Sequence, residues 1–111
     1  MRAFQPPWVV GVSRQDRWSP SEELTLRLTV EAGAYLREVR LHYREADQNR
    51  DFRTTALVGG HSGEYVFQVD TRCLDDSYEL IYYFEVVDVL GGGSFYPDPF
   101  REARYFVCRP E

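Results

Sequence analysis

The sequence of 111 residues predicts an all-β protein, folded as a single antiparallel β-sandwich of seven to eight strands. Segments in which apolar and polar residues alternate follow one another at intervals of about ten residues. Clusters of Gly, Pro, Asp and Ser, which favour turns, separate these segments. No segment shows a convincing helical period, and the only room for a helix is a single turn within residues 98–103. Short strands with regular turns are typical of sandwiches and barrels.

Residues 78–88 form the strand around which we expect the rest of the fold to be arranged. The segment is β-branched and aromatic, holds no Gly or Pro, and is followed by a glycine-rich turn. Side chains alternate between the two faces of a strand. The face predicted to line the core carries Leu80, Tyr82, Phe84 and Val86, and the outer face carries Ile81, Tyr83, Glu85 and Val87. Because both faces hold apolar residues, we expect this strand in the middle of a sheet.

The other clear strands show the same alternation, in residues 23–32, 36–44 and 64–70. A short strand at residues 8–12 follows two prolines, which confine it to a sheet edge or a strand start. These segments and the central strand together predict the hydrophobic core. Its members are Leu24, Leu26, Leu28, Val30, Val39, Leu41, Tyr43, Tyr65, Phe67, Val69, Leu80, Tyr82, Phe84 and Val86.

Two further segments are less regular. Residues 52–57 are a weak strand, because Phe52 and Leu57 differ in parity and can both be buried only with a bulge or an early end. Residues 95–96 begin a return strand that prolines interrupt and residues 104–108 complete. We expect polar loops at residues 15–21 and 45–51.

Composition restricts the class of protein. The net charge of −5 disfavours a general nucleic-acid role, since nucleic-acid-binding domains carry a basic footprint. No apolar run approaches the ~20 residues that a membrane-spanning helix needs, and the N-terminus lacks the apolar core of a signal peptide. We therefore expect one domain over residues 1–111, with no partner among membranes or nucleic acids. The early first strand and the abrupt end favour a module excised from a larger protein.

Catalytic and metal-binding patterns are missing. Neither His42 nor His61 belongs to a nucleophile motif, and adjacent carboxylates in a short link between strands are usually turn formers. No Cys-x-x-Cys or His-x-x-x-His spacing suggests zinc. Alternating acidic and amide residues at 47–51 resemble calcium ligands, but the Gly and distal Glu of an EF-hand loop are absent. We expect no enzyme activity, no metal and no cofactor.

The outer face of the central strand is the main candidate for a binding site. If residues 36–44 and 79–87 are neighbouring strands, their outward side chains share one surface. That surface holds Arg40, His42, Arg44, Tyr83 and Glu85. An aromatic ring beside donors and an acceptor suits a sugar, whose apolar C–H face stacks on the ring while its hydroxyls need polar partners. The alternative is a solvated sheet face with ordinary Arg–Glu cross-strand pairs.

Trp18 and Tyr96 are further candidate ligand-binding aromatics. Trp18 stands in a predicted polar loop, and Tyr96 stands beside the prolines of the return strand. A binding role requires both rings to be exposed near Tyr83. If they instead pack over the sandwich, no common surface forms.

The two cysteines leave two alternatives open. Cys73 and Cys108 are expected at the same pole of the sandwich, where a disulfide is geometrically permitted. Two buried free thiols are the alternative. An oxidised pair would indicate an extracytoplasmic protein.

In this arrangement the chain resembles immunoglobulin-like and fibronectin type III-like sandwich modules, notably the early-set group appended to bacterial enzymes that act on polysaccharides. The resemblance is carried by residues 39–44, 64–69 and 80–88, the glycine turn and residues 96–99. It spans nearly the whole chain. It implies a monomeric, non-catalytic accessory module that binds polysaccharide, within a secreted or extracytoplasmic parent protein. The alternative it also implies is a spacer or protein-interaction domain, in contact with neighbouring domains and without a small ligand.

Overall fold

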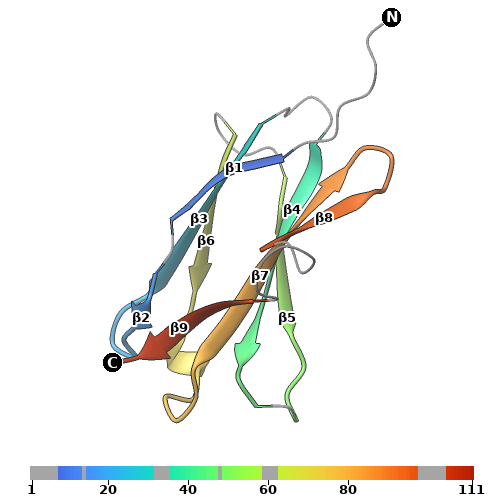
Figure 1. Cartoon of the computed structure of the whole chain (residues 1–111). Coiled ribbons are helices and arrows are strands. Elements are labelled where there is room, and N and C mark those ends of the chain that lie inside the picture. Colours follow the sequence, from blue (N-terminus) through green and yellow to red (C-terminus); the bar gives the residue numbers. More distant parts are fainter. Residues whose placement is uncertain (1–7, 14, 32–35, 48, 59–62, 98–104) are drawn as a thin grey trace, which may run out of the picture.

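The computed structural model describes residues 8–13, 15–31, 36–47, 49–58, 63–97 and 105–111, with the side chains of Trp8 and Val10 left out. Within these residues two β-sheets lie face to face (Figure 1). The predicted all-β sandwich is confirmed. Residues 98–103, where a single helical turn was possible, fall outside the described residues, as does His61.

The first sheet has three strands in the order β1–β3–β6. It consists of β1 (Trp8–Ser13), β3 (Leu24–Glu31) and β6 (Glu64–Val69), all paired antiparallel. Leu24, Leu26, Leu28 and Val30 of β3 are buried while the residues between them are not, as the alternation predicts. A turn of 3₁₀ helix, Thr71–Cys73, leads from β6 toward the second sheet.

The second sheet has the order β2–β9–β7–β4–β5, with β8 also paired to β7. Its strands are β2 (Arg17–Trp18), β4 (Leu36–Glu45), β5 (Arg53–Leu57), β7 (Leu80–Asp88), β8 (Gly93–Tyr96) and β9 (Phe106–Pro110). The central strand is therefore β7, between β4 on one side and β8 and β9 on the other. The described chain has nine strands, whereas seven to eight were expected. The two-residue strand β2 was not expected from the sequence.

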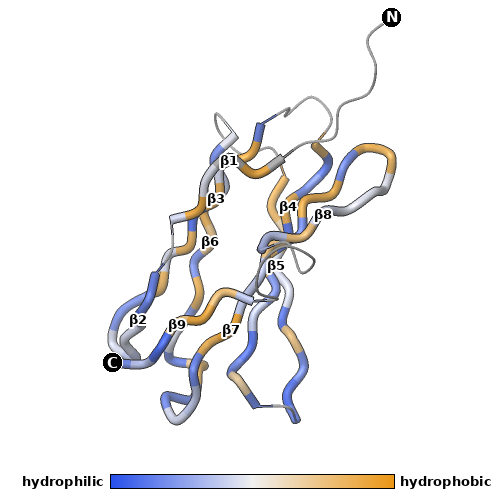
Figure 2. The backbone as a smooth tube through the Cα atoms, viewed as in Figure 1, coloured by the Kyte–Doolittle hydropathy of each residue, from blue (hydrophilic) through white to orange (hydrophobic). Residues whose placement is uncertain are grey.

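The core between the sheets matches the predicted set closely. All its members are buried except Tyr43, which is half-buried at the edge of the core. Tyr82, Phe84 and Phe67 are among the largest fully buried side chains. Hydrophobic and hydrophilic positions interleave along the strands of both sheets (Figure 2). The core also takes in Trp18, Leu74, Phe106 and Cys108, which alternation in the predicted strands did not include.

The return strand is split into two halves on the same side of β7. Phe84–Val87 pairs with β8, and Leu80–Tyr82 pairs with β9. Tyr83, between these two paired segments of β7, pairs with neither half. Tyr83 therefore stands at the position of β7 where its pairing passes from β9 to β8.

Candidate ligand-binding face

The register between β4 and β7 brings the predicted site residues together. Arg40 is paired with Glu85, His42 with Tyr83 and Arg44 with Ile81. Their neighbours on each strand, such as Leu41 and Phe84, are buried in the core. The predicted adjacency of these strands is therefore confirmed, and the five site residues lie on the outer face of the second sheet.

His42 is held in place by three contacts. Its ring stacks on Tyr83, with centroids 4.6 Å apart and planes inclined by 17°. Nε2 lies 3.0 Å from Oε1 of Glu85, and Nδ1 lies 2.9 Å from Oγ1 of Thr54 on β5. Because a carboxylate only accepts hydrogen bonds, Nε2 carries a proton that it donates to Glu85. In the neutral imidazole, Nδ1 then accepts the hydroxyl hydrogen of Thr54.

Three more aromatic rings surround Tyr83. The centroid of Phe52 is 5.3 Å from that of Tyr83, Phe95 is at 5.8 Å and Tyr105 is at 6.1 Å. These separations are in the range of favourable aromatic pairs. We call the set His42, Phe52, Tyr83, Phe95 and Tyr105 the aromatic face. It draws residues from β4, β7, β8 and the segments that precede β5 and β9.

The aromatic face is only partly covered. Phe95 is 46% exposed, whereas Phe52, Tyr83 and Tyr105 are half-buried. The pKa of the Tyr83 hydroxyl is raised, chiefly because burial disfavours the phenolate and secondly because Glu85 is negatively charged. The protonated hydroxyl remains both a hydrogen-bond donor and an acceptor within the face.

Two arginines border the aromatic face with different contacts. Arg40 binds Glu38 at 3.0 Å and approaches Glu85 at 3.5 Å. Its hydrogen bond holds the pKa of Glu38 below the ordinary value. The guanidinium of Arg44 lies over the Phe52 ring, 4.8 Å from its centroid, and Nη1 donates to the carbonyl oxygen of Asp47 at 2.5 Å.

The loop that carries Phe52 is fixed by a buried carboxylate. Glu45, at the end of β4, is 1% exposed and forms ion pairs with Arg50 and Arg53. Arg50 also binds Asp75 at 3.2 Å, which ties the loop to the link between β6 and β7. Buried charges need such partners, so this network holds the loop against the sheet.

The other two predicted aromatics do not join the face. Trp18 is 3% exposed, because β2 pairs with β9 and carries the indole into the core rather than leaving it in a loop. Tyr96 pairs with Phe84 and packs against Phe106 in the core, with centroids 5.5 Å apart. Both are corrections to the candidate site, since neither ring lies beside Tyr83 on the outer surface.

The cysteines are also separate. Cys73 is an exposed free thiol in the 3₁₀ turn, and Cys108 is a buried free thiol in β9. The bridge that the sequence permitted is not formed, and the alternative of two buried thiols holds only for Cys108.

Phe52, Phe95 and Tyr105 are the site residues that sequence reasoning missed. Tyr105 could have been found from alternation, because its neighbour Phe106 points into the core. Phe52 directly precedes β5, so its parity along the strand carried no information. Phe95 follows the glycine turn, whose geometry sets its register.

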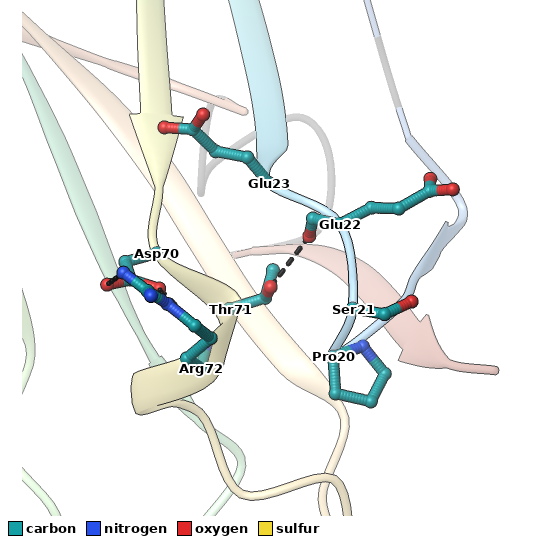
Figure 3. A pocket seen from close by; sticks show the side chains of 7 residues that line it. All are labelled: Pro20, Ser21, Glu22, Glu23, Asp70, Thr71 and Arg72. Carbon is teal, nitrogen blue, oxygen red and sulfur yellow. Dashed lines mark hydrogen bonds and ion pairs between the residues drawn. The ribbon is translucent and has the colours of Figure 1, made fainter.

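A hollow of about 400 Å³ lies elsewhere, at the end of the three-stranded sheet (Figure 3). Glu22, Glu23 and Asp70 are among its lining residues. Arg72 binds the Asp70 carboxylate at 3.0 Å and lowers its pKa, and the hydroxyl of Thr71 donates to the Glu22 carbonyl at 2.6 Å. These contacts engage Asp70, Thr71 and Arg72, and no aromatic ring is among the residues that line the hollow, so the aromatic face is the better-built candidate site.

The described residues hold no cluster of three or more potential metal ligands and no helix long and apolar enough to cross a membrane. Comparisons with models of protein families and with curated proteins find no match for this chain.

Proposed function

We propose that this chain is a non-catalytic accessory module of the immunoglobulin-like, fibronectin type III-like kind, and that its aromatic face binds polysaccharide. The observation that carries the proposal is the group of rings around Tyr83 on an outer sheet surface. Sugars stack their C–H faces on such rings. Phe95 belongs to the same group of rings and is 46% exposed, so the group is not simply part of the buried core.

Polar groups at the border of the aromatic face support the same function. Arg40 supplies guanidinium donors, Glu85 an acceptor, and Tyr83 a hydroxyl that can do both. Sugar hydroxyls require donors and acceptors at short range from the stacking ring. The resemblance to accessory modules of bacterial polysaccharide-acting enzymes agrees with this chemistry.

Docking of a neighbouring domain is the second candidate function. Val107 on β9 is 37% exposed on the same side of the sheet as Ile81, and Phe95 adds further apolar surface. Contiguous apolar surface rich in Tyr and Arg is typical of protein interfaces. In this case the module orients its parent protein and binds no glycan.

Affinity electrophoresis through gels that contain single polysaccharides separates the two functions. The native protein should be retarded by at least one polysaccharide, and Tyr83→Ala should weaken retardation by about tenfold or more. Phe95→Ala is the second variant, because an exposed side chain can be removed with little effect on folding. Val66→Ala, at an exposed position of the three-stranded sheet, is the control. Retention of both site variants equal to the native protein would contradict the proposed site, and no retardation in any gel would favour the docking function.

A further inference from the structure

Within the described part of the chain, Arg44 is a half-buried cation of this face that pairs with no carboxylate. The described part of the chain has three half-buried arginines, Arg40, Arg44 and Arg50. Arg40 and Arg50 bind carboxylates at 3.0 Å and 3.2 Å. For Arg44, the contacts within the described ranges are the Phe52 ring and a neutral backbone oxygen. A partly desolvated charge without a counter-charge is unfavourable, so an anion that binds Arg44 would supply the missing negative charge.

The geometry of Arg44 leaves its donors available. A guanidinium has five N–H donors in one plane, and one of them is used by the carbonyl oxygen of Asp47. The guanidinium lies over the Phe52 ring, and the structure gives its other N–H groups no hydrogen-bond acceptor among the described residues. A planar fork of this kind suits the paired oxygens of a carboxylate or a sulfate.

The carboxylates near Arg44 are already occupied. Asp47, whose backbone oxygen Arg44 binds, has its carboxylate 3.3 Å from Arg50, and Glu45, next to Arg44 in β4, pairs with Arg50 and Arg53. Neither is free to turn to Arg44 without breaking these contacts. Neither of these two carboxylates therefore competes with an acid from outside the protein for Arg44.

We infer that the ligand of the aromatic face is an anionic polysaccharide, and that Arg44 binds the carboxylate or sulfate group on one of its sugar rings. This inference rests on the proposed function. Phe52 contacts Arg44 as well as Tyr83 and Tyr105, so an anionic group on Arg44 would lie close to the rings on which the sugar stacks.

The net charge of −5 does not oppose such a ligand strongly at this site. On the outer face of β4 and β7, Glu38 and Glu85 both pair with Arg40, and Arg44 adds a further positive charge. The acidic hollow with Glu22 and Glu23 belongs to the other sheet. Charges farther away than a Debye length of about 8 Å at physiological salt are largely screened.

The test compares polysaccharides that share a backbone and differ in charge. The charged and neutral pairs are polygalacturonate and its methyl ester, carboxymethylcellulose and hydroxyethylcellulose, and dextran sulfate and dextran. Dissociation constants are measured for the native protein, Arg44→Gln and Arg44→Lys. The control is Arg27→Gln, which makes the same charge change at an exposed position of the three-stranded sheet, where Arg27 pairs with Glu64.

The native protein should bind one charged polymer at least tenfold more tightly than its neutral counterpart. Arg44→Gln should remove this preference, Arg44→Lys should restore part of it, and Arg27→Gln should retain it. Preference for the carboxylated or for the sulfated polymers shows which of the two anionic groups Arg44 binds. Melting temperatures of the Arg44 variants close to that of the native protein show that the change acts on binding.

Three results would overturn the inference. Equal binding of charged and neutral partners, or Arg44→Gln that binds as the native protein does, contradicts the role of Arg44 but leaves the proposed function standing. A preference that Arg27→Gln abolishes equally would assign it to net charge. Absence of binding to every polysaccharide contradicts the proposed function and this inference together.

Discussion

The imidazole of His42 lies flat against the ring of Tyr83, 4.6 Å away, and the two residues are direct cross-strand partners on β4 and β7. This stack covers one face of the Tyr83 ring. Hydrogen bonds to Glu85 and Thr54 fix the imidazole from both sides. Tyr83 is therefore the centre that organises the aromatic face, whereas Phe95 is its most exposed ring.

Two phenylalanines on this sheet should respond very differently to truncation. Phe84 is fully buried in the core, so Phe84→Ala should lower the free energy of unfolding by about 3–5 kcal/mol. Phe95 is 46% exposed, and Phe95→Ala should cost about 1 kcal/mol or less. Urea unfolding of both variants measures the difference. Similar losses at the two positions would contradict the register on which the faces of β7 depend.

The register of β7 was predictable because β7 and its neighbour β4 are both long strands with a regular alternation. Alternation placed Tyr82 and Phe84 inward and Tyr83 and Glu85 outward, and the structure agrees. A slip of one residue would have exposed the core side chains, so the pattern admits one solution.

Alternation had no means of placing residues outside the long strands. Trp18 is buried because β2 pairs with β9, a contact between segments about 90 positions apart that no local period encodes. Phe52 depends on the ion pairs of Glu45 and Arg50, which fix the loop before β5. The sequence thus predicted His42 and Tyr83 at the centre of the aromatic face. The surrounding rings, such as Phe52, depend on tertiary contacts that the sequence pattern does not show.

The buried carboxylate of Glu45 predicts a strong dependence on Arg50. Arg50→Ala removes the ion pairs to Glu45, Asp47 and Asp75 and leaves Arg53 as a weaker partner at 3.4 Å. We expect a loss of about 2 kcal/mol, below the 3–5 kcal/mol of a fully buried pair because Arg50 itself is partly exposed. Thermal or urea unfolding measures it.

Arg27→Ala is the matched control for Arg50. The pair Arg27–Glu64 is exposed on both sides, and such pairs contribute about 0–1 kcal/mol. If Arg50→Ala costs no more than Arg27→Ala, the network around Glu45 does not stabilise the fold, and the loop that carries Phe52 must be held by other contacts.

Two glycines with positive φ differ in the space around them. A Cβ on Gly63 (φ +76°) would lie 2.6 Å from the carbonyl oxygen of Val30, whereas a Cβ on Gly91 (φ +86°) meets nothing within 4 Å. Gly91→Ala should therefore cost about 1–2 kcal/mol, from the left-handed backbone alone. Gly63→Ala should cost clearly more, since the contact with the β3 backbone must also be relieved. Equal melting temperatures for the two variants would contradict the close approach at Gly63.

The two thiols should react at very different rates in the native protein. Cys73 is exposed, so iodoacetamide at pH 8 should add one group at this position. Cys108 is fully buried, and burial, with a smaller effect of Asp16, raises the pKa of its thiol to about 11. A second adduct should form only on unfolding, which intact-mass measurement with and without urea detects. Two rapid adducts, or none, would contradict the separate environments of the two thiols.

The raised pKa of Cys108 also predicts a pH dependence of stability. The folded state holds the thiol protonated up to a pKa of about 11, whereas the unfolded chain releases the proton near the ordinary value of 9.0. Between these values the unfolded state binds fewer protons, so this contribution to stability is complete below pH 9 and is lost as the pH rises toward 11. Cys108→Val, which has no titrating group, isolates the effect from other alkaline ionisations. The difference in melting temperature between the native protein and Cys108→Val should shift against the native protein across this interval, and a constant difference would show that the thiol does not titrate differently on folding.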